Sequence, residues 1–268
     1  MSKRANVNNK ITLKKLLRMK QESEKIVMIT AYDALFASIF NDYIDIILVG
    51  DSLNMSFAGE NDTLTATLEQ MIYHTKAVAK RSNRSFVLFD MPFGTYCTVE
   101  KALASAIKVY QESGADAIKL EGGVEKAQIV RALTQNSIAV FGHIGLQPQK
   151  VRLEGGYSIK GTNDKERIVA DALALQEAGA VALIIEGVKP DVTKAVTEAL
   201  DIPTIGIGAG IDCDGQVLVW SDMLGLYDAF TPKFVKTYLK GRELIGKAIE
   251  EYATDVKSGK FPALEHTY

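Results

Sequence analysis

The chain has 268 residues, of which 47% are apolar and 24% charged, with 31 basic and 33 acidic side chains. This apolar share is enough for a full hydrophobic core and excludes a disordered chain. A net charge of −2 provides no general attraction to nucleic acid or to an anionic membrane. Cys97 and Cys213 form no C-x-x-C motif and no disulfide framework, which indicates reduced thiols in a cytoplasmic protein.

The N-terminal segment 1–25 is basic but has no continuous apolar stretch, so it does not have the pattern of a signal peptide. Every apolar run in the chain ends well before the roughly 18 residues that a membrane-spanning helix needs. Leu13, Leu16 and Leu17 recur at helical spacing and predict a short helix that packs on the main domain.

Short apolar runs rich in β-branched residues alternate with longer helical patterns. Most runs are continuously apolar, which is typical of strands buried on both faces of a parallel sheet. The predicted strands are 26–32, 44–50, 86–91, 117–122, 138–145, 182–188, 204–210 and 217–222. The predicted helices are 34–41, 67–81, 99–113, 125–135, 165–178, 191–200 and 233–257, with Thr67 and Asp191 as helix N-caps and Pro190 at a helix start.

Strand and helix alternate through eight units, which predicts a parallel α/β fold. Eight units in a chain of this length favour a closed (β/α)₈ TIM barrel over an open doubly wound sheet. The extra N-terminal helix is expected to cover the bottom of the barrel. Because no linker rich in proline, glycine or serine interrupts the pattern, residues 1–268 are predicted to form a single barrel domain.

Four of the predicted strands end in a carboxylate. Asp51, Asp90, Glu121 and Glu186 each follow an apolar run, and a barrel of this kind has its active site at the C-terminal ends of its strands. A single such residue is equally well explained as a helix cap or a surface ion pair. Four at one end of a barrel repel each other unless a cation or protons relieve them, which favours a functional site.

Asp51, Asp90 and Glu121 come from three successive strands and supply only oxygen ligands. This set suits Mg²⁺ and disfavours zinc. Lys119 lies two residues before Glu121, so both side chains share one face of the strand. An inward lysine either binds an anionic substrate or pairs with these same carboxylates, and the first role is the preferred interpretation.

Glu186 follows an apolar lead-in that is expected to raise its pKa by desolvation. A glutamate of raised pKa near a polarised carbonyl is suited to act as a general base for α-proton abstraction. His143 ends another strand, where it either faces the pocket or is hydrogen-bonded in the wall. The glycines of 205–210 lack the context of a dinucleotide site and are interpreted as positions of close approach lining the mouth.

Several blocks together resemble the ketopantoate hydroxymethyltransferase family. The blocks are VGDSL at 49–53, DMPF at 90–93, KLEGG at 119–123, GHIGL at 142–146, GGY at 155–157, IGIGAG at 205–210 and CDGQVLV at 213–219. The resemblance runs in order from about Thr12 to Phe261. It implies a TIM barrel enzyme of pantothenate biosynthesis, a homodecamer, that transfers a hydroxymethyl group from 5,10-methylenetetrahydrofolate to 2-oxoisovalerate.

The resemblance also implies roles for individual residues. Asp51, Asp90 and Glu121 match the Mg²⁺ ligands of the family. Asp51, Ser52, Asp90 and Lys119 match its substrate-binding positions, and Glu186 matches its proton acceptor. Small-molecule substrates are therefore expected, and neither a nucleic acid nor a membrane partner is.

Two alternative functions remain open at this point. A Mg²⁺-dependent carbon–carbon lyase or mutase of the phosphoenolpyruvate mutase/isocitrate lyase type would use the same carboxylates. It would also need a reactive-loop cysteine, and Cys97 lies in no motif of that kind. A barrel retained only as a binding scaffold would not need the complete set of ligands, lysine and base.

Overall fold

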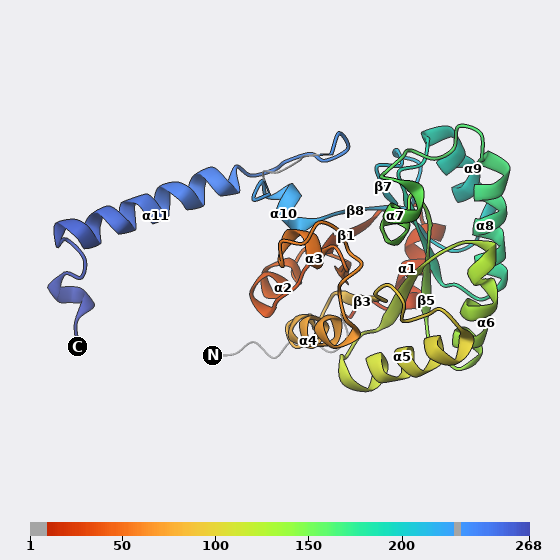
Figure 1. The fold of residues 1–268 in the computed structure, drawn as a ribbon, viewed down its shortest axis with the longest axis horizontal. Coiled ribbons are helices and arrows are strands. Elements are labelled where there is room, and N and C mark those ends of the chain that lie inside the picture. Colours follow the sequence, from red (N-terminus) through yellow and green to blue (C-terminus); the bar gives the residue numbers. More distant parts are fainter. Residues whose placement is uncertain (1–9, 228–231) are drawn as a thin grey trace. The chain divides into compact units, whose positions relative to one another are not determined.

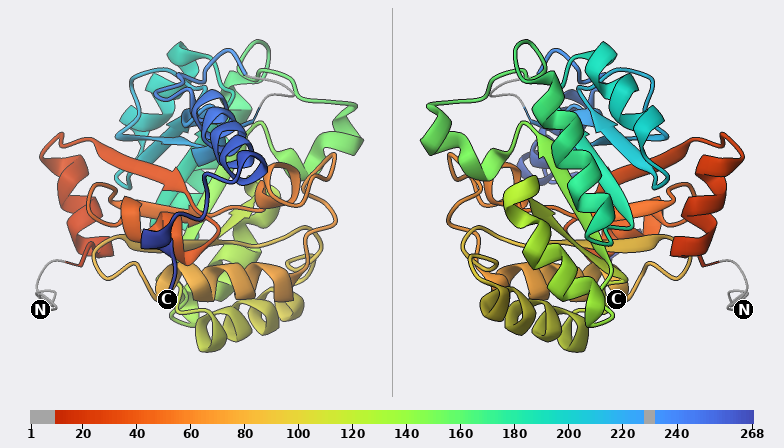
Figure 2. Two further views of the ribbon diagram at one scale, coloured as in Figure 1. Left: turned by 90° about the vertical axis from the view of Figure 1, so that its left-hand side faces the viewer. Right: turned by 90° about the vertical axis from the view of Figure 1, so that its right-hand side faces the viewer.

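The computed structural model describes residues 10–227 and 232–268. Eight parallel strands form a closed barrel in the order β1 to β8, and β8 pairs with β1 to complete it. The helices between the strands lie on the outside of the barrel (Figure 1). Figure 2 shows this arrangement from two sides. The predicted TIM barrel is therefore confirmed.

The strands are short and every one lies inside a predicted apolar run or within two residues of it. Their bounds are β1 Ile26–Thr30, β2 Ile46–Val49, β3 Phe86–Asp90, β4 Ala117–Glu121, β5 Val140–Gly145, β6 Ala182–Glu186, β7 Thr204–Ile207 and β8 Gly215–Leu218. The α-helices are α1 Leu13–Gln21, α2 Ala34–Phe40, α3 Leu53–Ser56, α4 Leu68–Ala79, α5 Val99–Glu112, α6 Ala127–Gln135, α7 Val151–Glu154, α8 Lys165–Glu177, α9 Pro190–Ala199, α10 Trp220–Met223 and α11 Gly241–Ser258. Short 3₁₀ helices are η2 Val124–Lys126, η3 Pro148–Lys150 and η4 Leu264–His266.

The interior of the barrel is filled by alternate residues of the strands, as the period of two requires. The buried cluster includes Ile26 and Met28 of β1, Ile46 and Leu48 of β2, Phe86 and Leu88 of β3, Ala117 of β4, Phe141 of β5, Ala182 and Ile184 of β6, Ile205 of β7 and Val217 of β8. Each of these rows continues upward, toward the C-terminal end of its strand, by further steps of two residues. In four of the rows the next position carries a titratable side chain, and these side chains build the site described below.

The N-terminal helix α1 closes the lower end of the barrel, as predicted. Thr12 caps it by accepting a hydrogen bond from the Lys15 amide. Leu16 and Met19 are fully buried in the same cluster as the first residues of the strands. Lys14 and Arg18 are exposed on its outer side, whereas Lys20 forms an ion pair with Asp214 over 2.9 Å.

Two sequence-based assignments near the end of the barrel were wrong. Asp191 is not an N-cap, because α9 begins at Pro190 and the cap is Lys189, whose carbonyl accepts from Val192. The last strand lies at Gly215–Leu218 rather than at 217–222, because residues from Trp220 onward enter α10. Gly215 does not fit an apolar strand pattern, yet it begins β8 because it pairs closely with Ile26 of β1. A Cβ at this position would lie 2.5 Å from the Ile26 carbonyl oxygen, so only glycine allows this pairing.

The long C-terminal helix starts at Gly241, eight residues later than the expected 233. The backbone amides of Tyr238 and Gly241 donate instead to the carbonyls of Met223 and Leu224. These bonds hold the preceding segment in a non-helical path, and the helix begins only after them. The sequence pattern did not contain this information, because the partners lie outside the segment itself.

The chain divides into two compact units, one ending at Val219 and the other comprising Trp220–Tyr268. The first contains the whole barrel, and the second contains α10, α11 and η4. A single domain over residues 1–268 stays a prediction. Within the described ranges, no helix combines the length and the apolar character needed to cross a membrane.

Candidate active site

The polar residues at the mouth of the barrel occupy the inward rows of their strands. Asp90 continues the row of Phe86 and Leu88, and Glu186 continues that of Ala182 and Ile184. Lys119 and Glu121 likewise follow Ala117, and His143 follows Phe141. The strand register places Asp90 beside Lys119 and Glu121 beside His143. The structure therefore brings these predicted residues to one place.

A buried ion pair lies at the centre of this group. Lys119 Nζ is 2.6 Å from Asp90 Oδ1 and 3.9 Å from Glu121 Oε1. Asp51, directly after β2, is joined to the same group because its backbone amide donates to Asp90 Oδ2 over 3.1 Å. All four side chains are buried. Of the two roles considered for Lys119, the pair with the carboxylates is the one present in this structure.

Three carboxylates face a single lysine here, and the pKa values of Asp51 and Glu121 are both raised. Burial, followed by the negative charge of Asp90, raises the pKa of Asp51 well above its usual range despite Lys119. Burial likewise raises the pKa of Glu121 to about 8, against the opposing effect of Lys119. Burial alone would lower the pKa of Lys119, but the surrounding carboxylates outweigh it and raise this pKa. The group therefore favours additional positive charge.

Glu186 and His143 form the other side of the site. The Glu186 side chain is 19% exposed, and its Oε2 lies 3.3 Å from His143 Nε2. Desolvation raises the pKa of Glu186 to about 7, with Lys119 acting in the opposite direction. His143 is fully buried, and burial, together with Lys119, lowers its pKa well below the usual value. A neutral imidazole thus lies against a carboxyl group that titrates near neutrality.

Ser52 lies in the turn between β2 and α3, next to Asp51. Its Oγ is 3.0 Å from the hydroxyl oxygen of Tyr32, which follows β1. The serine is half-buried. This contact places the hydroxyl at the rim of the group rather than at its centre, which is compatible with a role in substrate binding.

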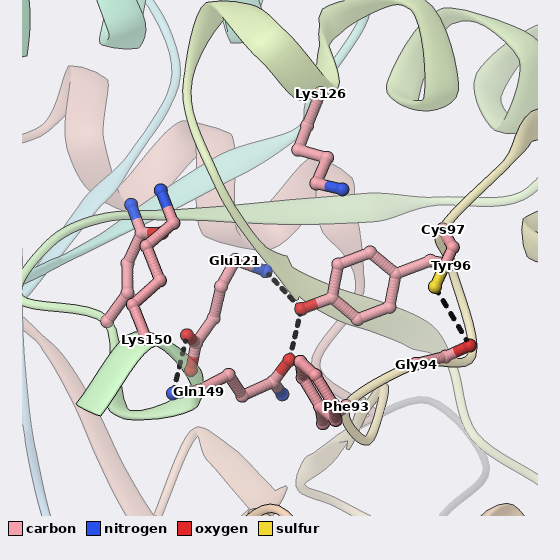
Figure 3. Close-up of a pocket in the computed structure, with 9 residues that line it drawn as sticks. Phe93, Gly94, Tyr96, Cys97, Glu121, Lys126, Gln149 and Lys150 are labelled. Carbon is pink, nitrogen blue, oxygen red and sulfur yellow. Dashed lines mark hydrogen bonds between the residues drawn. The ribbon is translucent and has the colours of Figure 1, made fainter. Parts of the chain in front are cut away.

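Sequence reasoning missed two residues at this site, Tyr96 and Gln149. Gln149 Nε2 donates to Asp51 Oδ2 over 2.9 Å, and its backbone amide donates to Glu121 Oε2 over 3.1 Å. The Tyr96 hydroxyl donates to Gln149 Oε1 and accepts from the Glu121 amide (Figure 3). The available signal was modest: a buried-type tyrosine and an amide, each in a loop that follows a strand ending in a predicted site residue.

A cavity of about 130 Å³ opens beside Glu121 and Gln149. Its lining combines aromatic, cationic and thiol groups: Phe93, Gly94, Tyr96, Cys97, Glu121, Lys126, Gln147, Gln149 and Lys150 (Figure 3). Lys126 Nζ lies 5.3 Å from the centre of the Tyr96 ring, within the range of a cation–π contact. The Cys97 thiol donates to the Gly94 carbonyl. Glu121 therefore connects the cluster of buried carboxylates to this small open cavity.

The donor set agrees with a hard divalent cation. Glu121 Oε1 is buried and has no hydrogen-bond partner among the described residues. In the same ranges, no group of three or more Asp, Glu, His or Cys side chains is placed to hold a metal ion by itself. Mg²⁺ commonly binds one or two carboxylates and completes its shell with water and substrate oxygens. The residues therefore fit Mg²⁺. Direct binding of the ion by all three carboxylates, Asp51, Asp90 and Glu121, stays a prediction.

Buried charged groups at the C-terminal ends of parallel strands define the class of this protein, a (β/α)₈-barrel enzyme with its active site at the mouth of the barrel. The family model for ketopantoate hydroxymethyltransferase matches residues 10–264. The chain belongs to the ketopantoate hydroxymethyltransferase family.

Relatives over the full length carry the same family name. A 3-methyl-2-oxobutanoate hydroxymethyltransferase of Helicobacter acinonychis (strain Sheeba) is 57% identical over 264 residues, which cover 98% of this chain and 97% of that protein. One from a Nitratiruptor species is 54% identical over 268 residues and covers 100% of both chains. The enzyme class that was expected from the sequence is thereby confirmed.

Solved structures of similar fold come from a different group of enzymes. A 2,3-dimethylmalate lyase, described as a member of the PEP mutase/isocitrate lyase superfamily, aligns with a TM-score of 0.60 and 17% identity, covering 94% of this chain and 89% of that one. A phosphonopyruvate hydrolase complex with oxalate and Mg²⁺ aligns with a TM-score of 0.61 and 14% identity, covering 95% and 93%. At this identity the likeness concerns the fold alone.

Proposed function

We propose that this enzyme transfers a hydroxymethyl group from 5,10-methylenetetrahydrofolate to 2-oxoisovalerate (3-methyl-2-oxobutanoate) and so forms ketopantoate in pantothenate biosynthesis. Family membership supports the reaction. The observation that carries the mechanism is the convergence of Asp90, Lys119, Glu121 and Glu186 on inward rows of neighbouring strands. Asp90 and Glu121 contribute to a cation site, Lys119 supplies a fixed positive charge, and Glu186 supplies a base, all at the mouth of the barrel.

Asp51, Asp90 and Glu121 are the residues that hold the metal in this proposal. When bound, Mg²⁺ supplies Lewis-acid polarisation of the substrate's 2-oxo group. Two negative charges remain when three ionised carboxylates are set against Lys119, which is the charge that a divalent cation neutralises. The raised pKa values of Asp51 and Glu121, caused first by burial and further by the neighbouring carboxylates, support this assignment, since a cation would relieve both costs of ionisation.

The oxoacid carboxylate is bound by Lys119 and Ser52, with Asp51 and Asp90 lining the same position. Lys119 Nζ has three protons and donates one to Asp90 at 2.6 Å, so further protons are available to an anionic substrate. Ser52 contributes a hydroxyl that is held at its place by Tyr32. Together these groups orient the oxoacid with its C3 toward the remaining side of the mouth.

Glu186 is the general base. Its pKa of about 7 allows the side chain to be ionised in a large fraction of molecules and still basic enough to accept a proton from C3. Water replaces the two folate C–N bonds of the methylene carbon, and its two protons pass to the folate nitrogens to give tetrahydrofolate. The carbanion equivalent at C3 attacks the resulting one-carbon carbonyl, and the proton held by Glu186 neutralises the new alkoxide as the hydroxymethyl group. The neutral His143 ring beside Glu186 adds no competing positive charge that would weaken the base.

The decisive experiment is a product assay with and without folate. Purified enzyme, Mg²⁺, 2-oxoisovalerate and 5,10-methylenetetrahydrofolate are expected to yield ketopantoate by mass spectrometry, and EDTA is expected to abolish the activity until Mg²⁺ is restored. A carbon–carbon lyase or mutase would act on its oxoacid without folate. Full turnover in verified metal-free enzyme would refute the metal centre.

Assembly into a homodecamer and a cytoplasmic location belong to the same proposal. The cytoplasmic location is supported by the two cysteines, both of which are free thiols. Assembly is supported by large apolar side chains that remain exposed on and after α2, namely Leu35, Ile39 and Tyr43. Sedimentation is expected to give a particle of ten 29.3-kDa chains. A stable monomer would refute the assembly and leave the chemistry untouched.

A further inference from the structure

One glutamine connects two carboxylates that come from different strands, one through its side chain and one through its backbone. Gln149 follows β5 in the 3₁₀ helix η3, yet it reaches Asp51 after β2 and Glu121 at the end of β4. Its Nε2 contacts Asp51 Oδ2 at 2.9 Å, and its backbone N contacts Glu121 Oε2 at 3.1 Å. Each carboxylate thus has one oxygen held by Gln149 and a second oxygen left for another ligand.

The orientation of this amide is determined by its other contacts. The Tyr96 hydroxyl donates to Gln149 Oε1, and Gln149 Nε2 also donates to the Met91 carbonyl over 3.0 Å. Turning the amide over would place its oxygen against the Asp51 carboxylate and its NH₂ against the Tyr96 proton. The tyrosine hydroxyl is oriented in turn, because it accepts from the Glu121 amide over 3.3 Å (Figure 3).

Both side chains use all the protons that they can donate. The two Nε2 protons of Gln149 go to Asp51 and Met91, and the single hydroxyl proton of Tyr96 goes to Gln149. Both residues are buried, at 7% and 6% exposure. Neither retains a donor for a substrate, so the hydrogen bonds of both side chains serve the carboxylates and the backbone around them.

We propose that Tyr96 and Gln149 are a pair of positioning residues that hold Asp51 and Glu121 in the arrangement required to bind a divalent cation. Tyr96 orients the side-chain amide of Gln149, which in turn holds Asp51, while the backbone amide of Gln149 holds the Glu121 carboxylate. Oδ1 of Asp51 is thereby left to the cation, together with Oε1 of Glu121, which accepts no hydrogen bond from the described residues. This inference rests on the proposed function, because it takes these two carboxylates as metal ligands.

The test measures metal binding directly, without substrate. Mn²⁺, which accepts the same oxygen ligands, is titrated into the metal-free enzyme and followed by electron paramagnetic resonance. Tyr96→Phe removes one oxygen and keeps the ring, and Gln149→Met keeps the side-chain length and removes both donors. Loss of an outer partner of a metal ligand typically weakens metal binding by about 10- to 100-fold. Each variant is expected to raise the Mn²⁺ Kd within this range.

Matched controls exist at the opposite end of the barrel. The Tyr110 hydroxyl donates to the Asp116 carbonyl and accepts from the Ala139 amide, in the same bridging manner as Tyr96. Gln176 accepts from the amides of Asp201 and Ile202. Tyr110→Phe and Gln176→Met are expected to lower the melting temperature and leave the Mn²⁺ Kd unchanged. A purely structural role for Tyr96 or Gln149 would give this same result.

The double variant tests whether the two residues act in one chain. If Tyr96 acts through Gln149, Tyr96→Phe combined with Gln149→Met is expected to bind Mn²⁺ as weakly as Gln149→Met alone. Losses that multiply would overturn this order of action. Unchanged Mn²⁺ affinity in folded Tyr96→Phe would overturn the pair, even if Gln149→Met failed to fold. No Mn²⁺ binding by the unaltered enzyme would instead overturn the proposed metal centre, and the inference with it.

Discussion

The pH dependence of proton removal from the oxoacid is the sharpest test of Glu186 as the base. With a pKa of about 7, its ionised fraction rises from about a tenth at pH 6 to about nine-tenths at pH 8. Only the ionised form accepts a proton, so the rate of C3 exchange is expected to rise about tenfold over this range. A carboxyl of ordinary pKa would already be ionised at pH 6 and would give a flat profile.

The assay follows loss of C3 deuterium from labelled 2-oxoisovalerate by NMR, in the presence of Mg²⁺ and without folate if the enzyme exchanges without it. The Glu186→Gln variant is expected to lose about 10²- to 10⁴-fold in rate, the usual contribution of a positioned base. Binding of the oxoacid is expected to persist, because the amide keeps the size of the side chain. Glu198→Gln on the outer helix α9, whose carboxylate lies 3.9 Å from Lys194, serves as the matched control.

Two results would refute the reasoning. A flat profile between pH 6 and pH 8 would show that the base does not have the raised pKa that its surroundings impose. Exchange in Glu186→Gln at the unaltered rate would remove Glu186 from the role altogether. His143 would then be the next residue to substitute, since its Nε2 is 3.3 Å from the Glu186 carboxylate. Its lowered pKa means that it contributes no titration within this pH range.

Further predictions concern the metal, the buried lysine and the barrel wall. Asp51→Asn is expected to weaken Mg²⁺ and oxoacid binding together in calorimetry, and loss of only one would contradict its shared role. Lys119→Met leaves buried carboxylates without their cation and is expected to cost about 3–5 kcal/mol in urea unfolding, whereas an unchanged midpoint would contradict the importance of the pair. Glu121 binds its proton more tightly in the folded state, with a pKa of about 8. The metal-free enzyme is therefore expected to lose up to about 1.4 kcal/mol of folding stability per pH unit as the pH rises from about 5 toward 8. Thermal scans in which stability instead increases with pH would contradict this prediction. A Cβ on Gly142 would lie 2.5 Å from the Leu183 side chain, so Gly142→Ala is expected to lower the free energy of unfolding by about 1–3 kcal/mol through overpacking. A gain in stability would contradict this prediction and show that Leu183 can move aside.

The sequence by itself determined the barrel and the rows that carry the chemistry. Continuous apolar runs marked the first seven strands, because strands covered on both faces have no reason to alternate. Asp90, Glu121 and Glu186 were identified from their place at the ends of such runs. The two-residue period then placed Lys119 on the same face as Glu121, and the structure places both on the inward row. These are local properties, so a single sequence contains them.

Only the tertiary structure decided which polar groups meet. Lys119 had two possible partners in the sequence, and the register of β3 with β4 placed it against Asp90. Tyr96 and Gln149 are 53 residues apart and come from different loops, so no local pattern links them. Each hydrogen bond depends on the path of a whole loop above the closed barrel. Burial and periodicity are recorded residue by residue, whereas the pairing of distant donors and acceptors exists only once the strands have closed.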